Sequence, residues 1–300
     1  MKIAFIGLGT MGGPMAMNIC KAFDDVRVYD ISKPALASFS SLNCSIARSP
    51  ADAAQGADVA MLMLPDSPQV RDAIFGRDGV ASTLKPGGFV VDLSTISAAE
   101  SIAIGNEATG AGFRFVDAPI GRTPRDALAG TLLVIAGGEE SHICELTPIF
   151  NAIASEIVHA GPRGSGIKLK LVNNYMSTVG AVLTAEALCL ARKAGLDRNI
   201  AVRVLRSTTA GRGQLLVNFP KKVLAGDTTP DFPMRMAHKD ISHALTLGAM
   251  SGSPLMLGAV ARELFGLASP WKRDREDWTA VLLLLEDISR AEQMQSGDEK

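Results

Sequence analysis

The N-terminal segment KIAFIGLGTMGGPMAMNICKAF constrains the fold more than any other part of the chain. It runs from a short apolar strand, through Gly7, Gly9 and Gly12, into a stretch with helical periodicity. Glycines at this spacing between a strand and a helix let the backbone turn tightly and approach a pyrophosphate at the helix N-terminus. The pattern therefore predicts the first βαβ unit of a Rossmann-type domain that binds a dinucleotide.

An acidic residue after the second expected strand indicates which dinucleotide is bound. The segment VRVYD ends at Asp30, 18 residues after Gly12. A carboxylate at this place accepts hydrogen bonds from the ribose hydroxyls and repels a 2′-phosphate, so NAD is favoured over NADP. Lys33 lies close by and would attract such a phosphate, which keeps NADP open as the alternative.

Strand patterns continue through the first half of the chain. The segments ADVAMLMLP, FVVDLST, FRFVDAP, TLLVIAGG and EIVHAG are apolar runs separated by helical stretches. Such runs are typical of parallel strands that are covered on both faces. The alternation predicts an α/β fold with a doubly wound sheet. After the second of these segments, Ser97 and Glu100 have the spacing of a capping box for the next helix.

Three strand ends are candidate ligand contacts, because ligands bind beyond the carboxyl ends of a doubly wound sheet. They are Leu64-Pro65, Ser94-Thr95 and Asp117-Ala118-Pro119. The alternative is simple turn chemistry, with the two prolines ending their strands. For Asp117 the structural and the functional interpretation are both open.

The strand pattern stops near residue 163, and helical periodicity follows. We therefore expect an NAD-binding Rossmann-type domain over residues 1–163 and an all-α domain over residues 164–300. A long helix should join them, from about Gly166 to Lys193, with Gly195 as its end. Pockets favour domain interfaces, so the first turns of this helix are a candidate site.

Lys170 stands in that helix, just before a stretch without charge from Leu171 to Ala185. A helix that is apolar all round is normally buried, and a buried lysine needs a partner or a purpose. Asn173, Asn174 and Ser177 follow three, four and seven residues later, which places all four polar side chains on one stripe. The stripe suggests a site for a small polar molecule. The alternative is that Lys170 extends to solvent.

Composition excludes several other classes of protein. The net charge is −1 and the charges are scattered, so no basic tract suggests nucleic acid. The four cysteines show no CxxC spacing and the four histidines are dispersed, so we expect neither a disulfide framework nor a metal site. The uncharged run of the long helix is too short to span a membrane. These features predict a soluble protein of the cytoplasm.

Several motifs in order along the chain resemble the β-hydroxyacid dehydrogenase family. They are GLGTMGGPM, LPD, DLST, DAP with a later GTL, GxGxxxK, NN and HKD, and they span essentially the whole length. The resemblance implies that Lys170 is the catalytic acid/base and that Asn174, with Asn173 and Ser177 beside it, holds the substrate. It implies an oligomer, usually a dimer or a tetramer. The cofactor contacts that the glycine pattern and the resemblance together predict are Gly7, Gly9, Thr10, Met11, Gly12, Asp30, Leu64, Pro65, Thr95 and Lys239.

One segment departs from the family pattern. Most members follow DAP with a serine and glycines that bind the substrate carboxylate, whereas this chain has Gly121, Arg122 and Thr123. The variant resembles members of the family that act on an aldehyde bearing a sulfonate. Arginine is a permanently charged fork that binds two oxygens of a sulfonate or of a carboxylate. The alternative is that Arg122 pairs with a nearby acid such as Asp126.

Together these features predict an NAD-dependent oxidoreductase that reduces a small anionic semialdehyde. A sulfonate-bearing aldehyde is the favoured substrate. Carboxylates are the alternatives: succinic semialdehyde, tartronate semialdehyde or 3-hydroxyisobutyrate. A non-catalytic NAD-binding module is the interpretation from a different class, and the presence of Lys170, Asn174 and Lys239 argues against it.

Overall fold

The computed structural model describes the backbone of residues 1–297 and the side chains of residues 1–290, and it divides into two compact units. The units are Met1–Tyr175 and Met176–Lys300, so the division falls inside the helix α8 (Ser165–Lys193). The predicted long helix is therefore confirmed, and the chain leaves it through Gly195, whose φ of 79° is left-handed. The predicted second domain runs to residue 300, and its last three residues lie outside the described range.

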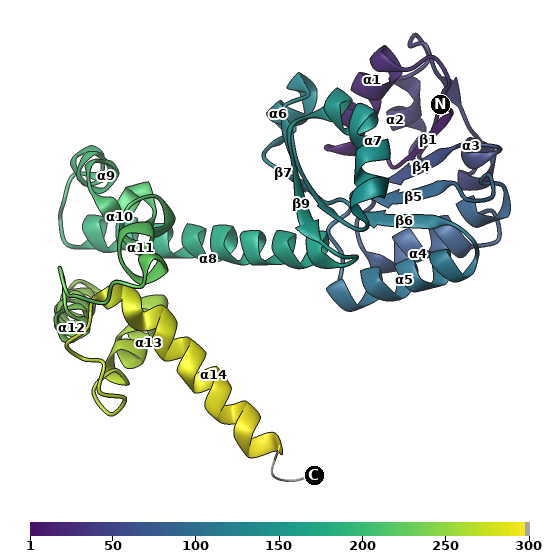
Figure 1. The fold of residues 1–300 in the computed structure, drawn as a ribbon. Helices are drawn as coiled ribbons and strands as arrows, with labels where there is room; N and C mark the ends of the chain where they lie inside the picture. The colour runs from purple at the N-terminus through teal and green to yellow at the C-terminus, as the bar shows by residue number, and fades with distance from the viewer. Residues whose placement is uncertain (298–300) are drawn as a thin grey trace. The chain divides into compact units, whose positions relative to one another are not determined.

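The first unit is a Rossmann-type sheet with helices on both faces (Figure 1). Its strand order is β3-β2-β1-β4-β5-β6-β8-β7, with β9 also paired to β8. The chain leaves β1 toward β2 and β3, then crosses to β4 on the other side. This reversal next to β1 creates the crevice where such sheets bind ligands. The strands are β1 (Ile3–Ile6), β2 (Val26–Tyr29), β3 (Ser45–Ile46), β4 (Val59–Leu62), β5 (Phe89–Asp92), β6 (Arg114–Asp117), β7 (Ile120–Gly121), β8 (Leu132–Gly137) and β9 (Ala154–Gly161).

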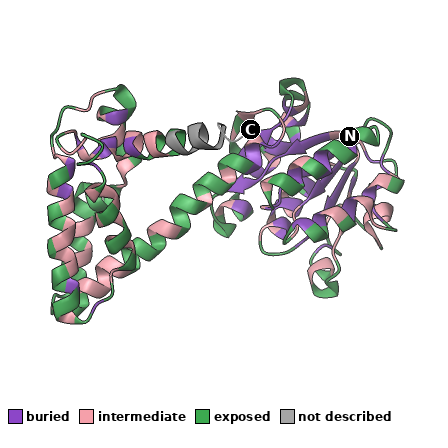
Figure 2. Cartoon of the chain, turned by 90° about the horizontal axis from the view of Figure 1, so that it is seen from below, coloured by how far each residue is buried: buried purple, intermediate pink, exposed green. Residues whose placement is uncertain are grey.

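Alternate side chains of each strand enter separate apolar cores, which is why the strands read as continuous apolar runs. Ile3 and Phe5 pack into the core under α1 (Gly12–Ala22) and α7 (Glu140–Ile153). Ala4 and Ile6 pack into the core under α4 (Ser67–Phe75) and α5 (Ala98–Gly110). Figure 2 shows these strands as buried. The remaining helices of this unit are short: α2 (Lys33–Ala37), α3 (Pro50–Ala54) and α6 (Pro124–Ala129).

One end of the sheet departs from the parallel arrangement. β8 runs antiparallel to both β6 and β7, and Asp117 faces Gly137 in the β6–β8 register. The connection from β7 to β8 contains only the short helix α6, and a parallel crossover needs about a dozen residues or more. The return strand therefore runs in the opposite direction, and it brings Gly137 beside the end of β6.

The predicted capping box at Ser97 and Glu100 is wrong. Ser97 is the N-cap of α5, as its position suggests, but its side chain makes no capping bond. Glu100 instead pairs with Arg71 of α4, at 3.8 Å. The reciprocal capping bonds occur at α6, where the Thr123 hydroxyl and the Asp126 carboxylate hold each other's backbone N–H groups.

The second unit is helical over its described residues. Its longer helices are α9 (Arg198–Ser207), α12 (Met234–Ser251), α13 (Met256–Gly266) and α14 (Val281–Gly297). Short helices connect them: α10 (Thr209–Arg212) and α11 (Asn218–Lys221). Its buried core includes Met234, Ala268, Ala280 and Leu284. In the part of the chain that the structure describes, no helix has the length and apolar character to cross a membrane.

The expectation that α8 is buried is wrong for the single chain. Only Gly166 and Ile167, in its first turn, are buried. The uncharged stretch beyond them is exposed or half-buried, and Val172 and Tyr175 are more than 60% exposed. Packing within the first unit, as far as its residues are described, therefore covers only the first turn of this helix.

Candidate active site

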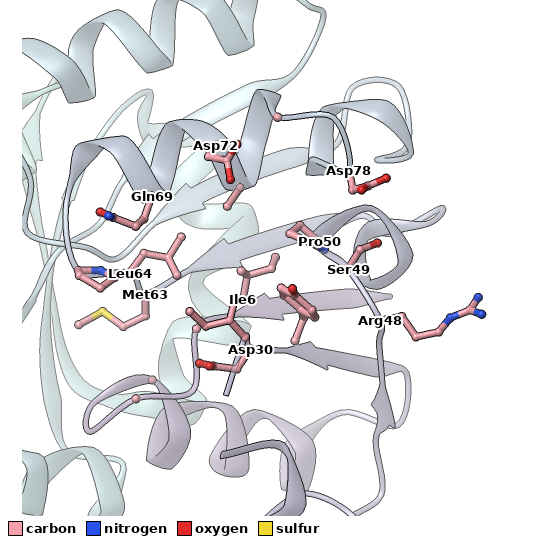
Figure 3. A pocket seen from close by; sticks show the side chains of 18 of the residues that line it. Ile6, Asp30, Arg48, Ser49, Pro50, Met63, Leu64, Gln69, Asp72 and Asp78 are labelled. Carbon is pink, nitrogen blue, oxygen red and sulfur yellow. The ribbon is translucent and has the colours of Figure 1, made fainter. Parts of the chain in front are cut away.

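A cavity of about 800 Å³ opens at the carboxyl ends of β1 and β4, next to the reversal in strand order. This volume is in the range of cofactor and ligand sites. In Figure 3, Gln69 and Asp72 of α4 lie on one side of the cavity and Asp30 on the other, with Ile6, Met63 and Leu64 between them. Eight predicted cofactor contacts line this cavity: Gly7, Gly9, Thr10, Met11, Gly12, Asp30, Leu64 and Pro65.

The three glycines of the loop differ in what a side chain at each position would contact. A side chain at Gly7 or at Gly12 would overlap backbone of the protein, the Met63 and Gly7 carbonyl oxygens respectively. A Cβ at Gly9 would meet no protein atom within 4 Å. Protein packing therefore does not require a glycine at position 9, whereas a pyrophosphate lying against the backbone does.

The N-terminus of α1 is suited to an anion. No acidic side chain lies in its first turn and no side chain caps it, so its N–H groups and its dipole are available to a ligand. Asp30 stabilises the loop in front of this helix: its carboxylate accepts from the Leu8 N–H at 2.6 Å and from the Ser32 N–H at 2.7 Å. The residues present thus fit a dinucleotide, with its phosphates at α1 and its ribose at Asp30.

Part of the cavity wall was not predicted from the sequence. Arg48, Ser49 and Pro50 form one end, and Figure 3 shows the Arg48 side chain directed away from the cavity. Asp72 and Asp78, from α4 and the loop after it, line the side opposite Asp30. The Ser49-Pro50 pair could have predicted this part of the wall, because a serine cap followed by proline begins a helix, here α3, directly after a strand of the same sheet.

Two predicted cofactor contacts do not line the cavity. Thr95 follows Ser94, whose hydroxyl accepts from the Leu64 N–H at 2.9 Å, so it lies next to the cavity wall. Lys239 belongs to α12 in the second unit, where its ammonium pairs with Asp240 at 3.0 Å.

Lys170 is half-buried on α8, and burial lowers the pKa of its ammonium below the ordinary 10.5. Among the described residues its ammonium has no hydrogen bond or ion pair. On the same helix, Asn173 donates to the Asn174 side-chain oxygen at 3.3 Å. Asn173 and Ser177 are exposed and Asn174 is half-buried. An amine that loses its proton more readily than usual is better suited to proton exchange than an ordinary lysine.

The predicted anion-binding loop is engaged in contacts within the protein. The Arg122 guanidinium donates to Glu156 at 2.7 Å, to the Ser155 hydroxyl at 2.7 Å and to the Thr131 carbonyl oxygen. Its partner is therefore Glu156 rather than Asp126. Gly121 is buried in β7, where it pairs with Leu133, and the Thr123 side chain caps α6.

Two buried carboxyl groups lie side by side at the ends of β5 and β6. Asp92 and Asp117 are register partners, and each is 1% exposed. Burial, with a smaller contribution from the neighbouring Asp117, raises the pKa of Asp92 to about 7, against the hydrogen bonds from Ser94. Burial also raises the pKa of Asp117, against backbone N–H groups of Gly164 and Ile167. No cluster of three or more metal-ligating side chains occurs in the described part of the chain.

Comparison with known proteins covers both units. The protein-family model for the NAD binding domain of 6-phosphogluconate dehydrogenase matches residues 2–161. The protein-family model for NAD-binding of NADP-dependent 3-hydroxyisobutyrate dehydrogenase matches residues 164–285. These matches confirm the predicted NAD-binding domain and its dinucleotide cofactor.

Individual relatives extend over nearly the whole chain. The 3-sulfolactaldehyde reductase of Escherichia coli (strain K12) is 40% identical over 93% of this chain and 94% of its own length. The 3-hydroxyisobutyrate dehydrogenase of Pseudomonas aeruginosa is 32% identical over 88% of this chain and 91% of its own. A solved structure of Mycobacterium tuberculosis 3-hydroxyisobutyrate dehydrogenase with L-serine has a TM-score of 0.65 at 29% identity, covering 95% of this chain and 98% of that one.

We predict that Gly9→Ala weakens NADH binding about tenfold or more without lowering stability. The added methyl group meets open space in the protein but enters the volume that the pyrophosphate needs. Overpacking by one carbon costs about 1–3 kcal/mol, and 1.4 kcal/mol is a factor of ten. Fluorescence titration with NADH and thermal unfolding measure the two quantities.

Gly12→Ala is the matched control, because its methyl group would overlap the Gly7 carbonyl oxygen. It should lower the melting temperature even without a ligand. An unchanged affinity for NADH in Gly9→Ala would place the phosphates elsewhere.

Proposed function

This chain belongs to the β-hydroxyacid dehydrogenase family of NAD-dependent oxidoreductases, and we propose that it reduces 3-sulfolactaldehyde to 2,3-dihydroxypropane-1-sulfonate. The observation that carries this proposal is the resemblance to the 3-sulfolactaldehyde reductase of Escherichia coli over nearly the whole chain. The dinucleotide cavity and the half-buried Lys170 support it, because they supply a place for the reductant and a proton donor.

NADH, held along the glycine loop and at Asp30, would supply the hydride that reduces the aldehyde carbon. The chain's own contribution is the proton: the Lys170 ammonium gives it to the carbonyl oxygen, so the aldehyde becomes a primary alcohol. Burial of Lys170 favours this transfer, because it destabilises the charged form of the amine. In the reverse direction the neutral amine removes the proton from the hydroxyl group. Asn174, one turn further along α8, is in register to orient Lys170 and the substrate hydroxyl.

Arg122 is the proposed ligand of the sulfonate, with Gly121 and Thr123 beside it and with Asn173 and Ser177 from α8. Its ion pair with Glu156 is no obstacle, because the two side chains are 36% and 54% exposed. Exposed ion pairs contribute about 0–1 kcal/mol, so an anionic substrate can replace Glu156 at small cost. Thr95 and Lys239 remain proposed contacts of the cofactor.

Side-by-side assay of semialdehydes with NADH tests the substrate. We expect 3-sulfolactaldehyde to have the highest kcat/KM, above succinic semialdehyde and tartronate semialdehyde, with 3-hydroxyisobutyrate assayed in the oxidative direction. A higher kcat/KM for a carboxylate would mean that this carboxylate, rather than 3-sulfolactaldehyde, is the substrate of the same reaction. NADH binding without turnover of any of these compounds would instead support the interpretation of the protein as a non-catalytic NAD-binding module.

Arg122→Ala, in the same assay, should raise the KM for 3-sulfolactaldehyde by about tenfold or more, since one charged hydrogen bond contributes about 1.5–3 kcal/mol. Arg125→Ala is the matched control, an exposed arginine three residues further on. Equal effects of the two substitutions would remove Arg122 from the substrate site.

Lys170→Ala should reduce turnover by about 10²–10⁴-fold, the contribution of a general acid, and should leave NADH binding unchanged. Lys168→Ala, an exposed lysine of the same helix, is the control. Because burial lowers the Lys170 pKa, aldehyde reduction in the native enzyme should fall as the pH rises through a pKa below 10.5. Alcohol oxidation should rise through the same pKa. Near-normal turnover of Lys170→Ala would remove this residue from the mechanism.

We further propose that the active form is a homodimer or homotetramer in which a second copy covers α8. The support is the apolar surface of this helix, where Val172, Tyr175, Met176, Val182 and Leu183 are each at least half exposed. Contiguous exposed apolar residues on a helix favour association. Sedimentation velocity should give a multiple of the 31.5 kDa chain mass, and a monomer at micromolar concentration would contradict the proposal.

The proposed location is the cytoplasm. All four cysteines, Cys20, Cys44, Cys144 and Cys189, are free, which suits a reducing compartment where NADH is available. Recovery of the native protein only from a membrane or secreted fraction would contradict this location.

A further inference from the structure

The carboxylate of Asp117 connects the end of β6 to the first turn of α8. Its Oδ1 accepts from the Gly164 N–H at 2.7 Å, and its Oδ2 accepts from the Ile167 N–H at 2.9 Å. Both carboxylate oxygens are thus used on the N-terminus of one helix, where N–H groups lack partners within the helix and the dipole favours a negative charge.

Glycines on both sides bring the helix this close to the sheet. A Cβ on Gly166 would lie 2.6 Å from the Asp117 carbonyl oxygen, and a Cβ on Gly137 would lie 2.7 Å from either Asp117 carboxylate oxygen. Gly164, with φ of 84°, turns the chain into the helix in a conformation that favours glycine. We call Asp117, Gly137, Gly164 and Gly166 the helix seat.

Lys170 lies one turn beyond this seat. It follows Ile167 by three residues, so its Cα is about 4.5 Å further along the helix axis. No side chain among the described residues holds its ammonium. The point on the backbone from which the Lys170 side chain extends is therefore set by the first turns of α8, which the helix seat fixes to the ends of β6 and β8.

From this arrangement we propose that Asp117 is a positioning residue for Lys170: it fixes the first turn of α8 so that the lysine amine meets the reacting oxygen. The inference rests on the proposed role of Lys170 as the proton donor. Asp117 acts through the helix backbone rather than by its charge, because burial alone accounts for the lowered pKa of Lys170. The sequence left Asp117 between a structural and a functional role, and this proposal joins the two.

Asp117→Asn tests the proposal. An amide has one acceptor oxygen, so it can serve only one of the two N–H donors and presents its own N–H₂ to the other. A displacement of about 1 Å in an acting group can cost about a hundredfold in rate. We expect kcat to fall by roughly 10–100-fold, with KM for the semialdehyde and affinity for NADH changed less than about threefold. The isotope effect with NADH deuterated at the transferred hydride should rise, because the chemical step becomes slower.

A double substitution separates positioning from general damage. If Asp117 acts through Lys170, adding Asp117→Asn to Lys170→Ala should cause no further loss of kcat, since residues that act as a unit are not additive. Asp92→Asn is the matched control, because it changes a neighbouring buried carboxyl that accepts from the Ser94 N–H and not from α8. Asp92→Asn should change kcat by the same factor in the Lys170→Ala variant as in the native enzyme.

The outcomes distinguish this inference from the proposed function. Near-normal turnover of Lys170→Ala would remove the proton donor, and the inference with it. A strong loss in Lys170→Ala together with a native kcat in Asp117→Asn would overturn the inference alone. Multiplied losses in the double variant, or a fall in NADH-binding titre that matches the fall in kcat, would also overturn it, because both indicate loss of folded protein.

Discussion

The contact between the Asp117 carboxylate and the N-terminus of α8 is the interaction on which the site depends. The Rossmann sheet positions the cofactor cavity at the ends of β1 and β4, but the proposed proton donor stands on a helix outside the sheet. Two short hydrogen bonds to Gly164 and Ile167 tie this helix to the end of β6. The carboxylate is buried, so solvent does not compete for these bonds, and the helix N–H groups offset part of its desolvation.

Local patterns predicted most of the fold because their physical causes are local. The continuous apolar runs correspond to strands whose alternate residues enter two cores, and the glycine loop falls where the first strand meets its helix. β3 and β7 have two residues each, too few for a recognisable pattern. The antiparallel direction of β8 depends on the length of a connection rather than on any residue type, so strand composition did not reveal it.

The site was predicted less completely because its contacts join distant parts of the chain. Gly9 and Asp30 follow from spacing alone, whereas Arg48 enters the cavity wall only through the pairing of β3 with β2. Asp117 meets α8 some fifty residues later, and nothing in its sequence surroundings marks that partner. The apolar character of α8 was correctly recognised, but composition does not say whether the covering surface comes from the same chain or from another copy.

Arg122 is one of two non-glycine residues with a positive φ among the described residues, the other being Lys272. Its φ of 79° is left-handed, a conformation that costs a non-glycine residue about 1 kcal/mol or more. The ion pair with Glu156 is solvent-exposed and returns at most about 1 kcal/mol. A glycine would satisfy the backbone here without strain, as in the family pattern that this chain departs from. The guanidinium is therefore better explained by an anion that it can bind, a sulfonate or a carboxylate, than by the backbone conformation that it strains.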